Sequence, residues 1–273
     1  MTDRRFHFAN SRIAHESLRG DVQAPQFAEG AARQVVSPVA DLCAAQRGKR
    51  DAQLLMGTEF EVLETHEGWS FGRSLEDGYV GYVAAEQLGP TAISTHWISA
   101  RSSQIYSAAD IKSPEIANIS FGSKLAVARI EGTFAELETG GFVPVQHLST
   151  KTLTDPALVA LGFLGVPYLW GGNSSLGIDC SGLVQQSLRA CGTECPRDSD
   201  QQEAYFTEDV TDAAMMRRGD LVFWKGHVGM MLNEQEMIHA NAHHMAVAIE
   251  SFSEACARIG ANEFGQITAM KRP

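Results

Sequence analysis

The sequence predicts an α+β domain at the C-terminal end of the chain, preceded by two small β-barrels. Residues 36–150 contain an internal repeat whose units alternate in hydrophobicity as strands do. Beyond a boundary near residue 151, two helix-like segments precede several strand-like runs. The 273 residues, 44% hydrophobic and 20% charged, suffice for more than one domain and are typical of globular chains.

Residues 1–35 are polar and mixed, without a sustained period. We interpret them as an N-terminal arm that packs across another domain, with a disordered tail as the alternative. The segment contains no apolar run typical of a signal peptide, and no stretch is long and apolar enough to span a bilayer. We therefore expect a cytoplasmic protein that does not bind membranes.

The net charge limits the possible partners, and the cysteines indicate the compartment. A net charge of −11 argues against a nucleic-acid surface, which needs clustered lysine and arginine. The cysteines are odd in number and show no framework spacing, which favours a reducing compartment. They are Cys43, Cys180, Cys191, Cys195 and Cys256. The pair at residues 191 and 195 is interpreted as packing thiols rather than as a zinc site or a disulfide.

Residues 36–150 consist of two copies of one small unit. Gly57-Thr-Glu-Phe60 is echoed by Gly122-Ser-Lys-Leu125, and Glu67-Gly68-Trp69 is echoed by Glu131-Gly132-Thr-Phe134. Short alternating runs separated by tight turns indicate antiparallel strands, and units of this length favour a small barrel. The predicted domains are residues 36–90 and residues 91–150.

The C-terminal domain, residues 151–273, is predicted to begin with a helix. Thr154 or Asp155 can cap it, Pro156 fits its first turn, and Gly165 ends it. A second helix is expected to open at residue 180, and a short one after the loop at residues 196–202. Strands are then expected at residues 221–225, 226–232, 237–240 and 245–249.

Cys180 is the strongest candidate for a nucleophile. It follows a glycine-rich segment, Tyr168-Leu-Trp-Gly-Gly172, and lies in the first turn of the expected helix. Unpaired N–H groups and the helix dipole favour a thiolate there, so a lowered thiol pKa is expected. A structural cysteine is the alternative, but the glycines favour close approach of the backbone to a ligand.

A nucleophilic cysteine needs a base and a group that orients that base. His227 is the candidate base, and His239, on the next expected strand, is the candidate orienting group. A symmetric turn at residues 233–236 would pair His239 with Met230 and turn it away from His227. An odd-length loop or a bulge is therefore required. A metal site from His239, His243 and His244 is the rival interpretation, and we expect no metal or other cofactor.

These motifs resemble the NlpC/P60 family of papain-like cysteine peptidases. The resemblance rests on Tyr-Leu-Trp-Gly-Gly, Asp-Cys-Ser-Gly-Leu-Val, Arg-Arg-Gly-Asp-Leu-Val-Phe-Trp, His-Val-Gly-Met and Ile-His-Ala, and it covers residues 155 to about 250. Residues 36–150 resemble two bacterial SH3-like (SH3b) modules, most specifically at Gly78-Tyr-Val-Gly-Tyr82, where the family often has Trp in place of Tyr82.

The resemblance implies hydrolysis of the γ-D-glutamyl–diamino acid bond of free cell-wall peptides with an unblocked N-terminal L-Ala, a role in murein peptide recycling. Cys180 would attack the carbonyl, His227 would act as base and then acid, and His239 would orient it. The Cys180 N–H and Tyr168 would stabilise the oxyanion. The further residues implied to bind this small peptide substrate, L-Ala-γ-D-Glu-diamino acid, are Asp179, Ser181, Ser199, Tyr79 and, more weakly, Asp51.

Three alternatives stand beside these assignments. Tyr79 and Tyr82 could simply be packing residues of the barrel. The papain-like scaffold could perform amidase or acyl-transfer chemistry instead. The chain could also bind wall peptides without catalysis.

Overall fold

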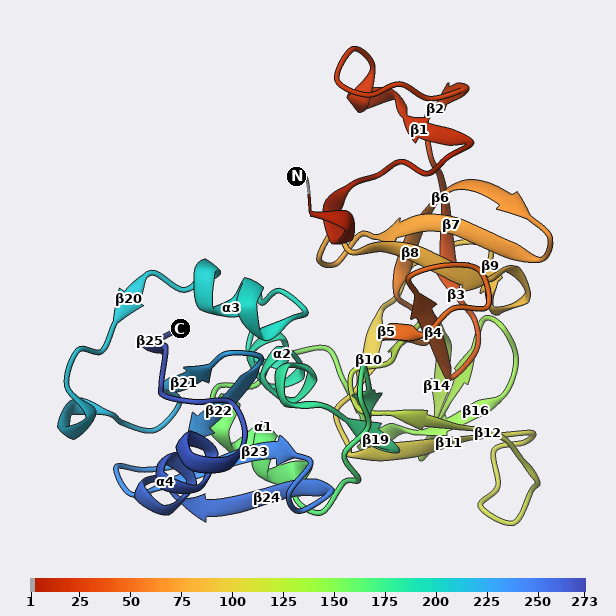
Figure 1. Ribbon diagram of the computed structural model, residues 1–273. Helices are drawn as coiled ribbons and strands as arrows, with labels where there is room; N and C mark the ends of the chain where they lie inside the picture. Colours follow the sequence, from red (N-terminus) through yellow and green to blue (C-terminus); the bar gives the residue numbers. More distant parts are fainter. Residues whose placement is uncertain (1–2) are drawn as a thin grey trace. The chain divides into compact units, whose positions relative to one another are not determined.

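The structure, a computed structural model, describes residues 3–273. The chain divides into two compact units, residues 1–150 and residues 151–273 (Figure 1). Among the described residues, no helix combines the length and the hydrophobicity needed to cross a membrane.

The N-terminal residues form a packed arm rather than a disordered tail. Phe8 and Ile13 are buried in one cluster with Leu63, Phe71 and Val80, and β1 and β2 pair in parallel. The arm therefore packs within its own unit. Its elements are η1 (Arg4–Phe6), β1 (Ile13–His15), η2 (Glu16–Leu18) and β2 (Gln26–Ala28).

A seven-stranded sheet with the order β5-β4-β8-β7-β6-β3-β9 follows the arm. Its pairs are antiparallel, and its core includes Leu42, Phe60 and Val83. The expected turn at Glu67 and Gly68 is confirmed, because both residues have positive φ between β6 and β7. The elements are β3 (Ala31–Val35), β4 (Val39–Cys43), β5 (Arg50–Leu55), β6 (Glu59–His66), β7 (Trp69–Ser74), β8 (Val80–Ala84), η3 (Ala85–Gln87) and β9 (Leu88–Gly89).

The sheet begins earlier than the sequence indicated. β3 pairs with β6 and β9, so a strand of the sheet lies inside the segment expected to be an arm. The first three residues of β3 are exposed, which explains why the sequence shows no alternating pattern there.

The second repeat forms a five-stranded sheet, β12-β11-β16-β15-β14, and a three-stranded sheet, β13-β10-β17. The succession β14, β15, β16, η4, β17 has the same order as β6, β7, β8, η3, β9. The repeat in the sequence thus corresponds to a repeat of elements. The bounds are β10 (His96–Ile98), β11 (Ser102–Tyr106), β12 (Glu115–Ser120), β13 (Lys124–Leu125), β14 (Val127–Glu131), β15 (Phe134–Leu137), β16 (Phe142–Pro144), η4 (Val145–His147) and β17 (Leu148–Ser149).

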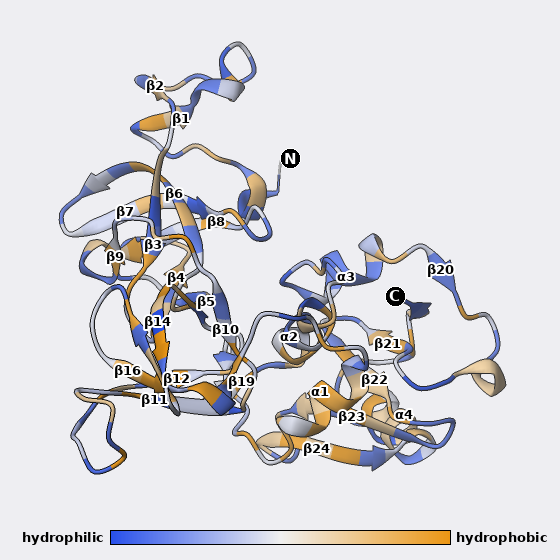
Figure 2. Ribbon diagram, turned by 180° about the vertical axis from the view of Figure 1, so that it is seen from behind, coloured by the Kyte–Doolittle hydropathy of each residue, from blue (hydrophilic) through white to orange (hydrophobic). Residues whose placement is uncertain are grey.

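The C-terminal unit has helices α1, α2 and α3 before most of its sheet, as predicted. Asp155 caps α1 by accepting from the N–H groups of Ala157 and Leu158. Residues 180–188 of α2 are buried, and α2 contacts α1, β22 and β23. In Figure 2, α1 is strongly apolar. The helices are α1 (Pro156–Gly162), α2 (Cys180–Ala190), α3 (Ser199–Tyr205), η5 (Ala213–Met215) and α4 (Phe252–Asn262).

The sheet of this unit has the order β20-β25-β21-β22-β23-β24. The four predicted strands are confirmed as β21 to β24, the last of which lies at the edge of the sheet. Helix α4 packs on the sheet through Ala255 and Ile259. The strands are β18 (Asn173–Ser174), β19 (Gly177–Ile178), β20 (Glu208–Asp209), β21 (Leu221–Trp224), β22 (His227–Met231), β23 (Glu236–Asn241), β24 (Ala246–Ser251) and β25 (Ala269–Arg272).

The register between β22 and β23 resolves the difficulty that the sequence raised. Met230 pairs with Ile238 rather than with His239. Residues 232–235 join β22 (His227–Met231) to β23 (Glu236–Asn241). The Leu232 N–H donates to the Glu236 carbonyl at 2.8 Å, so this pair closes a loop of three residues, 233–235. The Asn233 side chain accepts from the N–H groups of Gln235 and Glu236. This odd length brings His239 to the face that carries His227.

Replacing Phe60 by Ala should lower the free energy of unfolding by about 3–5 kcal/mol, because it leaves a cavity in a fully buried core. Urea denaturation of the full chain would measure this loss. Leu75→Ala is the matched control, since Leu75 is 46% exposed and its loss should cost less than about 0.5 kcal/mol. Equal effects of the two substitutions would contradict the assigned core.

Candidate active site

Cys180 lies at the first position of α2, as predicted. Asp179 is the N-cap, and its Oδ1 accepts from the Gly182 N–H at 2.7 Å. The thiol accepts hydrogen bonds from the backbone N–H groups of Ser181 and Val228. The second contact places the sulfur against β22, directly beside the predicted base.

The expectation of a lowered thiol pKa is not met in this structure. Burial, followed by the nearby Asp179 carboxylate, raises the pKa of Cys180 to about 12. The two backbone N–H donors lower this pKa but do not offset burial. Cys180 is therefore a neutral thiol in the free protein.

His227 and His239 form a direct hydrogen bond, with 2.8 Å between His227 Nε2 and His239 Nδ1. His227 is also stacked against Phe264 at 5.1 Å between ring centroids. Burial, and then His239, lower the pKa of His227 to about 3. Burial also lowers the pKa of His239. Both rings are therefore neutral near neutral pH, and the predicted base and orienting group are brought together.

A carboxylate behind the histidines was missed by the sequence reasoning. His239 Nε2 lies 2.6 Å from Glu250 Oε2. Arg258 donates to both oxygens of Glu250, at 3.1 Å and 2.6 Å. The hydrogen bond from His239, together with Arg258, lowers the pKa of Glu250 to about 2. The sequence predicted only part of this contact. It predicted a strand where β24 lies, but nothing in it indicated that Glu250 would share a face with His239.

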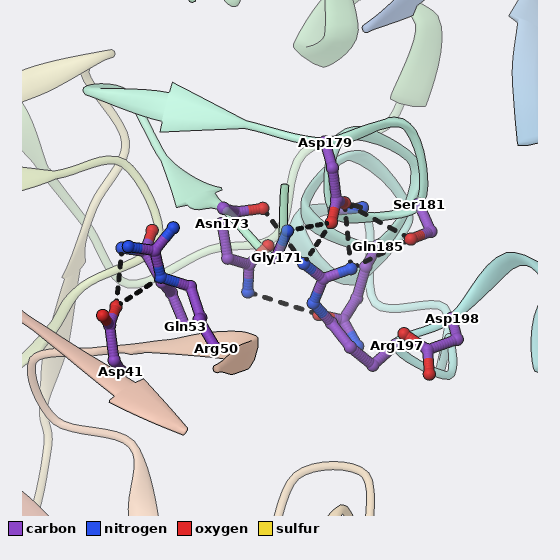
Figure 3. Close-up of polar contacts among 12 residues, drawn as sticks. Asp41, Arg50, Gln53, Gly171, Asn173, Asp179, Ser181, Gln185, Arg197 and Asp198 are labelled. Atoms are coloured by element: carbon purple, nitrogen blue, oxygen red, sulfur yellow. Dashed lines mark hydrogen bonds and ion pairs between the residues drawn. The ribbon is translucent and has the colours of Figure 1, made fainter. Parts of the chain in front are cut away.

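Asp179 is held in a dense polar network (Figure 3). Its carboxylate accepts from the Gly171 N–H at 2.9 Å and from Ser181 Oγ at 3.3 Å, in addition to Gly182. Arg197, 1% exposed, donates to both of its oxygens at 3.0 Å and 2.8 Å. With these contacts Asp179 fixes the start of α2, and they leave little capacity for a substrate ammonium. The contact of Asp179 with a substrate amine stays a prediction.

Arg197 was also missed, because a single arginine in a predicted loop carries no pattern. It donates to Ser181 Oγ at 2.9 Å and to the Gly172 carbonyl at 3.1 Å. Ser181 is thus part of this network. Ser199, the first residue of α3, is buried.

Tyr168 lies near the thiol and is half-buried. Burial, followed by the nearby Cys180 and Asp179, raises the pKa of its phenol. The phenol therefore remains a neutral hydrogen-bond donor, as an oxyanion contact requires.

The two residues expected to contribute from the first repeat lie in the other unit. Tyr79 is buried in the core with Leu42 and Phe60, so barrel packing is observed for it. Asp51 accepts from Arg4 at 2.7 Å. Their contacts with a substrate stay predictions.

The described residues contain no cluster of His, Cys, Asp and Glu suited to a metal ion. The rings of His243 and His244 meet edge to face, with 4.8 Å between ring centroids. Cys43, Cys180, Cys191, Cys195 and Cys256 are free thiols.

Comparisons with known proteins agree with this geometry. Residues 165–258 match the model of the NlpC/P60 family, and these residues contain Cys180, His227 and His239. This part of the chain is an NlpC/P60 domain. Residues 42–88 match the model described as the bacterial dipeptidyl-peptidase Sh3 domain. The second repeat keeps its SH3-like assignment as a prediction.

Relatives share both parts of the chain. Dipeptidyl-peptidase 6 of Lysinibacillus sphaericus is 29% identical over 229 residues, covering 74% of this chain and 84% of that protein. The gamma-D-glutamyl-L-lysine dipeptidyl-peptidase of Bacillus cereus is 25% identical over 226 residues, covering 70% and 67%.

A solved NlpC/P60 family protein from Bacillus cereus shares the fold. Its TM-score is 0.72 at 18% identity, covering 89% of this chain and 99% of that one. The NlpC/P60 domain and its papain-like fold are thus established, together with an SH3-like domain before it.

Lowering the pH should destabilise the protein between about pH 6.5 and pH 3. The unfolded chain protonates His227 near its ordinary pKa of 6.5, whereas the folded chain does so only near 3, so the unfolded state binds more protons throughout this window. The lowered pKa of His239 acts in the same direction, and that of Glu250 adds to it below pH 4.5. Urea denaturation at a series of pH values would show the decline, and His227→Gln should flatten it. An equally steep decline in that variant would contradict the assigned burial.

Asp179→Asn should lower the free energy of unfolding by about 3–5 kcal/mol, because it leaves the buried Arg197 without its carboxylate. Thermal and urea denaturation would measure the loss. Asp77→Asn, on the turn before β8, is a control that removes one charge elsewhere and should change stability far less. A fully stable Asp179→Asn variant would contradict this structural role and would favour a contact between the Asp179 carboxylate and the substrate amine.

Proposed function

We propose that this protein is a cysteine peptidase that hydrolyses the γ-D-glutamyl–L-diamino acid amide of small cell-wall peptides. The main support is the arrangement of Cys180, His227 and His239 within an NlpC/P60 domain. The substrate class is supported by the relatives named gamma-D-glutamyl-L-lysine dipeptidyl-peptidase and by the Sh3 domain of dipeptidyl-peptidase type.

The neutral state of the site determines how the reaction starts. With the pKa of Cys180 near 12 and that of His227 near 3, a preformed thiolate–imidazolium pair is disfavoured in the free enzyme. The thiol proton therefore passes to His227 as sulfur attacks the amide carbonyl. His239 holds the imidazole of His227 during this transfer.

The tetrahedral intermediate needs donors for its oxyanion. The Cys180 N–H at the start of α2 is one candidate, and the neutral Tyr168 phenol is the other. His227 then protonates the leaving amine of the diamino acid, which leaves a thioester on Cys180. Water activated by His227 hydrolyses the thioester and releases L-Ala-D-Glu.

Recognition of a free N-terminal L-Ala is the second part of the proposal. An ammonium group requires acceptors, and Tyr79 and Asp51 of the first unit remain candidates, with Ser199 as a polar contact from the C-terminal unit. Selection for free N-termini suits released wall peptides rather than intact wall, and thus a recycling role in the cytoplasm.

The deciding experiment uses L-Ala-γ-D-Glu-diaminopimelate and its L-lysine counterpart, each with a free and an acetylated N-terminus. We expect release of L-Ala-D-Glu from the free forms. For the acetylated forms kcat/KM should be lower by roughly 10- to 150-fold, because acetylation removes one hydrogen bond of a charged group. Cys180→Ala should abolish turnover. Mass spectrometry of the products measures both effects.

Other outcomes identify the alternatives. Equal cleavage of free and acetylated peptides would contradict the proposed recognition of the free N-terminal amine. Binding without turnover, unchanged in Cys180→Ala, would indicate a wall-peptide binding protein. Transfer of the acyl group to an added amine in preference to water would indicate an acyltransferase.

A further inference from the structure

Glu250 is the one ionised side chain in direct contact with the histidine pair in the described structure. Its Oε2 lies 2.6 Å from His239 Nε2, and Arg258 binds both of its oxygens. His239 is fully buried, and the Glu250 side chain is only 14% exposed. The carboxylate is therefore in a position to control the protons of both rings.

The direction of the hydrogen bonds follows from the chemistry of the partners. An ionised carboxylate only accepts, so His239 Nε2 must carry a proton. In a neutral ring, His239 Nδ1 is then an acceptor. Because it lies 2.8 Å from His227 Nε2, that nitrogen must be the donor.

This order leaves one ring nitrogen for the chemistry. With its proton on Nε2, neutral His227 has its lone pair on Nδ1, for which the described residues provide no hydrogen-bond partner. We propose that Glu250, held by Arg258, is a positioning residue that fixes the tautomers of His239 and His227 so that His227 Nδ1 is the base for Cys180. The proposal rests on the role of Cys180 and His227 in the proposed function.

Glu250 also supplies charge when the base is protonated. Transfer of the thiol proton to Nδ1 creates an imidazolium whose Nε2–H still donates to His239. The negative charge behind His239 stabilises that cation through the same chain of hydrogen bonds. Atoms and charge balance within the set: the thiol loses a proton and His227 gains it.

The first test needs no variant and no substrate. Nitrogen-15 chemical shifts of the imidazole rings at neutral pH distinguish protonated from unprotonated ring nitrogens. We expect a proton on Nε2 of both His227 and His239. A proton on Nδ1 of His239 would overturn the proposal even if the protein is a peptidase.

The second test compares Glu250→Gln with Glu263→Gln. Glu263 also pairs with Arg258 but does not contact either histidine, so the control removes the same charge from the same arginine. The readout is the rate at which iodoacetamide alkylates Cys180 at neutral pH, followed by mass spectrometry of its peptide. We expect Glu250→Gln to slow alkylation about tenfold and Glu263→Gln to leave it near the parent rate.

The outcomes separate this proposal from the proposed function. Parent-like alkylation and parent-like tautomers in a folded Glu250→Gln protein would overturn the positioning role. An equal loss in both variants would assign the effect to Arg258 and the local fold, and would also overturn it. Failure of the parent to cleave wall peptides would leave both readouts intact, because neither uses a substrate.

Discussion

The hydrogen bond between His227 and His239 depends on which faces of β22 and β23 their side chains occupy. Side chains alternate along a strand, so a shift of one residue in the pairing would separate the rings completely. The three-residue loop at residues 233–235 sets the pairing of Met230 with Ile238, and the Asn233 side chain holds the loop. The candidate catalytic geometry thus rests on a short polar turn outside the site.

The start of α2 provides the second fixed point. Asp179 caps the helix and binds Arg197 at the same time, so the glycine-rich segment, the helix and the loop before α3 meet at one carboxylate. Gly182 fits there because a Cβ would approach the Gly172 carbonyl oxygen to 2.6 Å. This close packing holds Cys180 against β22 and leaves its thiol almost without solvent.

Burial decides the electrostatic state of the site. A helix start favours a thiolate, and a neighbouring imidazolium would favour it further. Removal from water, however, penalises both the thiolate of Cys180 and the imidazolium forms of the two histidines. Cys180 and His227 are both neutral as a result. Glu250 keeps its charge because Arg258 and His239 both donate to it.

The sequence by itself determined the two-repeat, α+β organisation, the strands β21 to β24, the helix start at Cys180 and the candidate pair of histidines. These features follow from local patterns: alternation, capping residues and glycine-rich turns. Only the tertiary structure decided the register that joins His227 to His239 and the hydrogen bonds from Arg197 to the Asp179 carboxylate. It also decided the burial that raises the pKa of Cys180, where the sequence predicted a lowered pKa. It also revealed Glu250 and Arg258 behind the histidines. Such contacts join residues 8 to 18 positions apart through the folded chain, and no local pattern in the sequence specifies them.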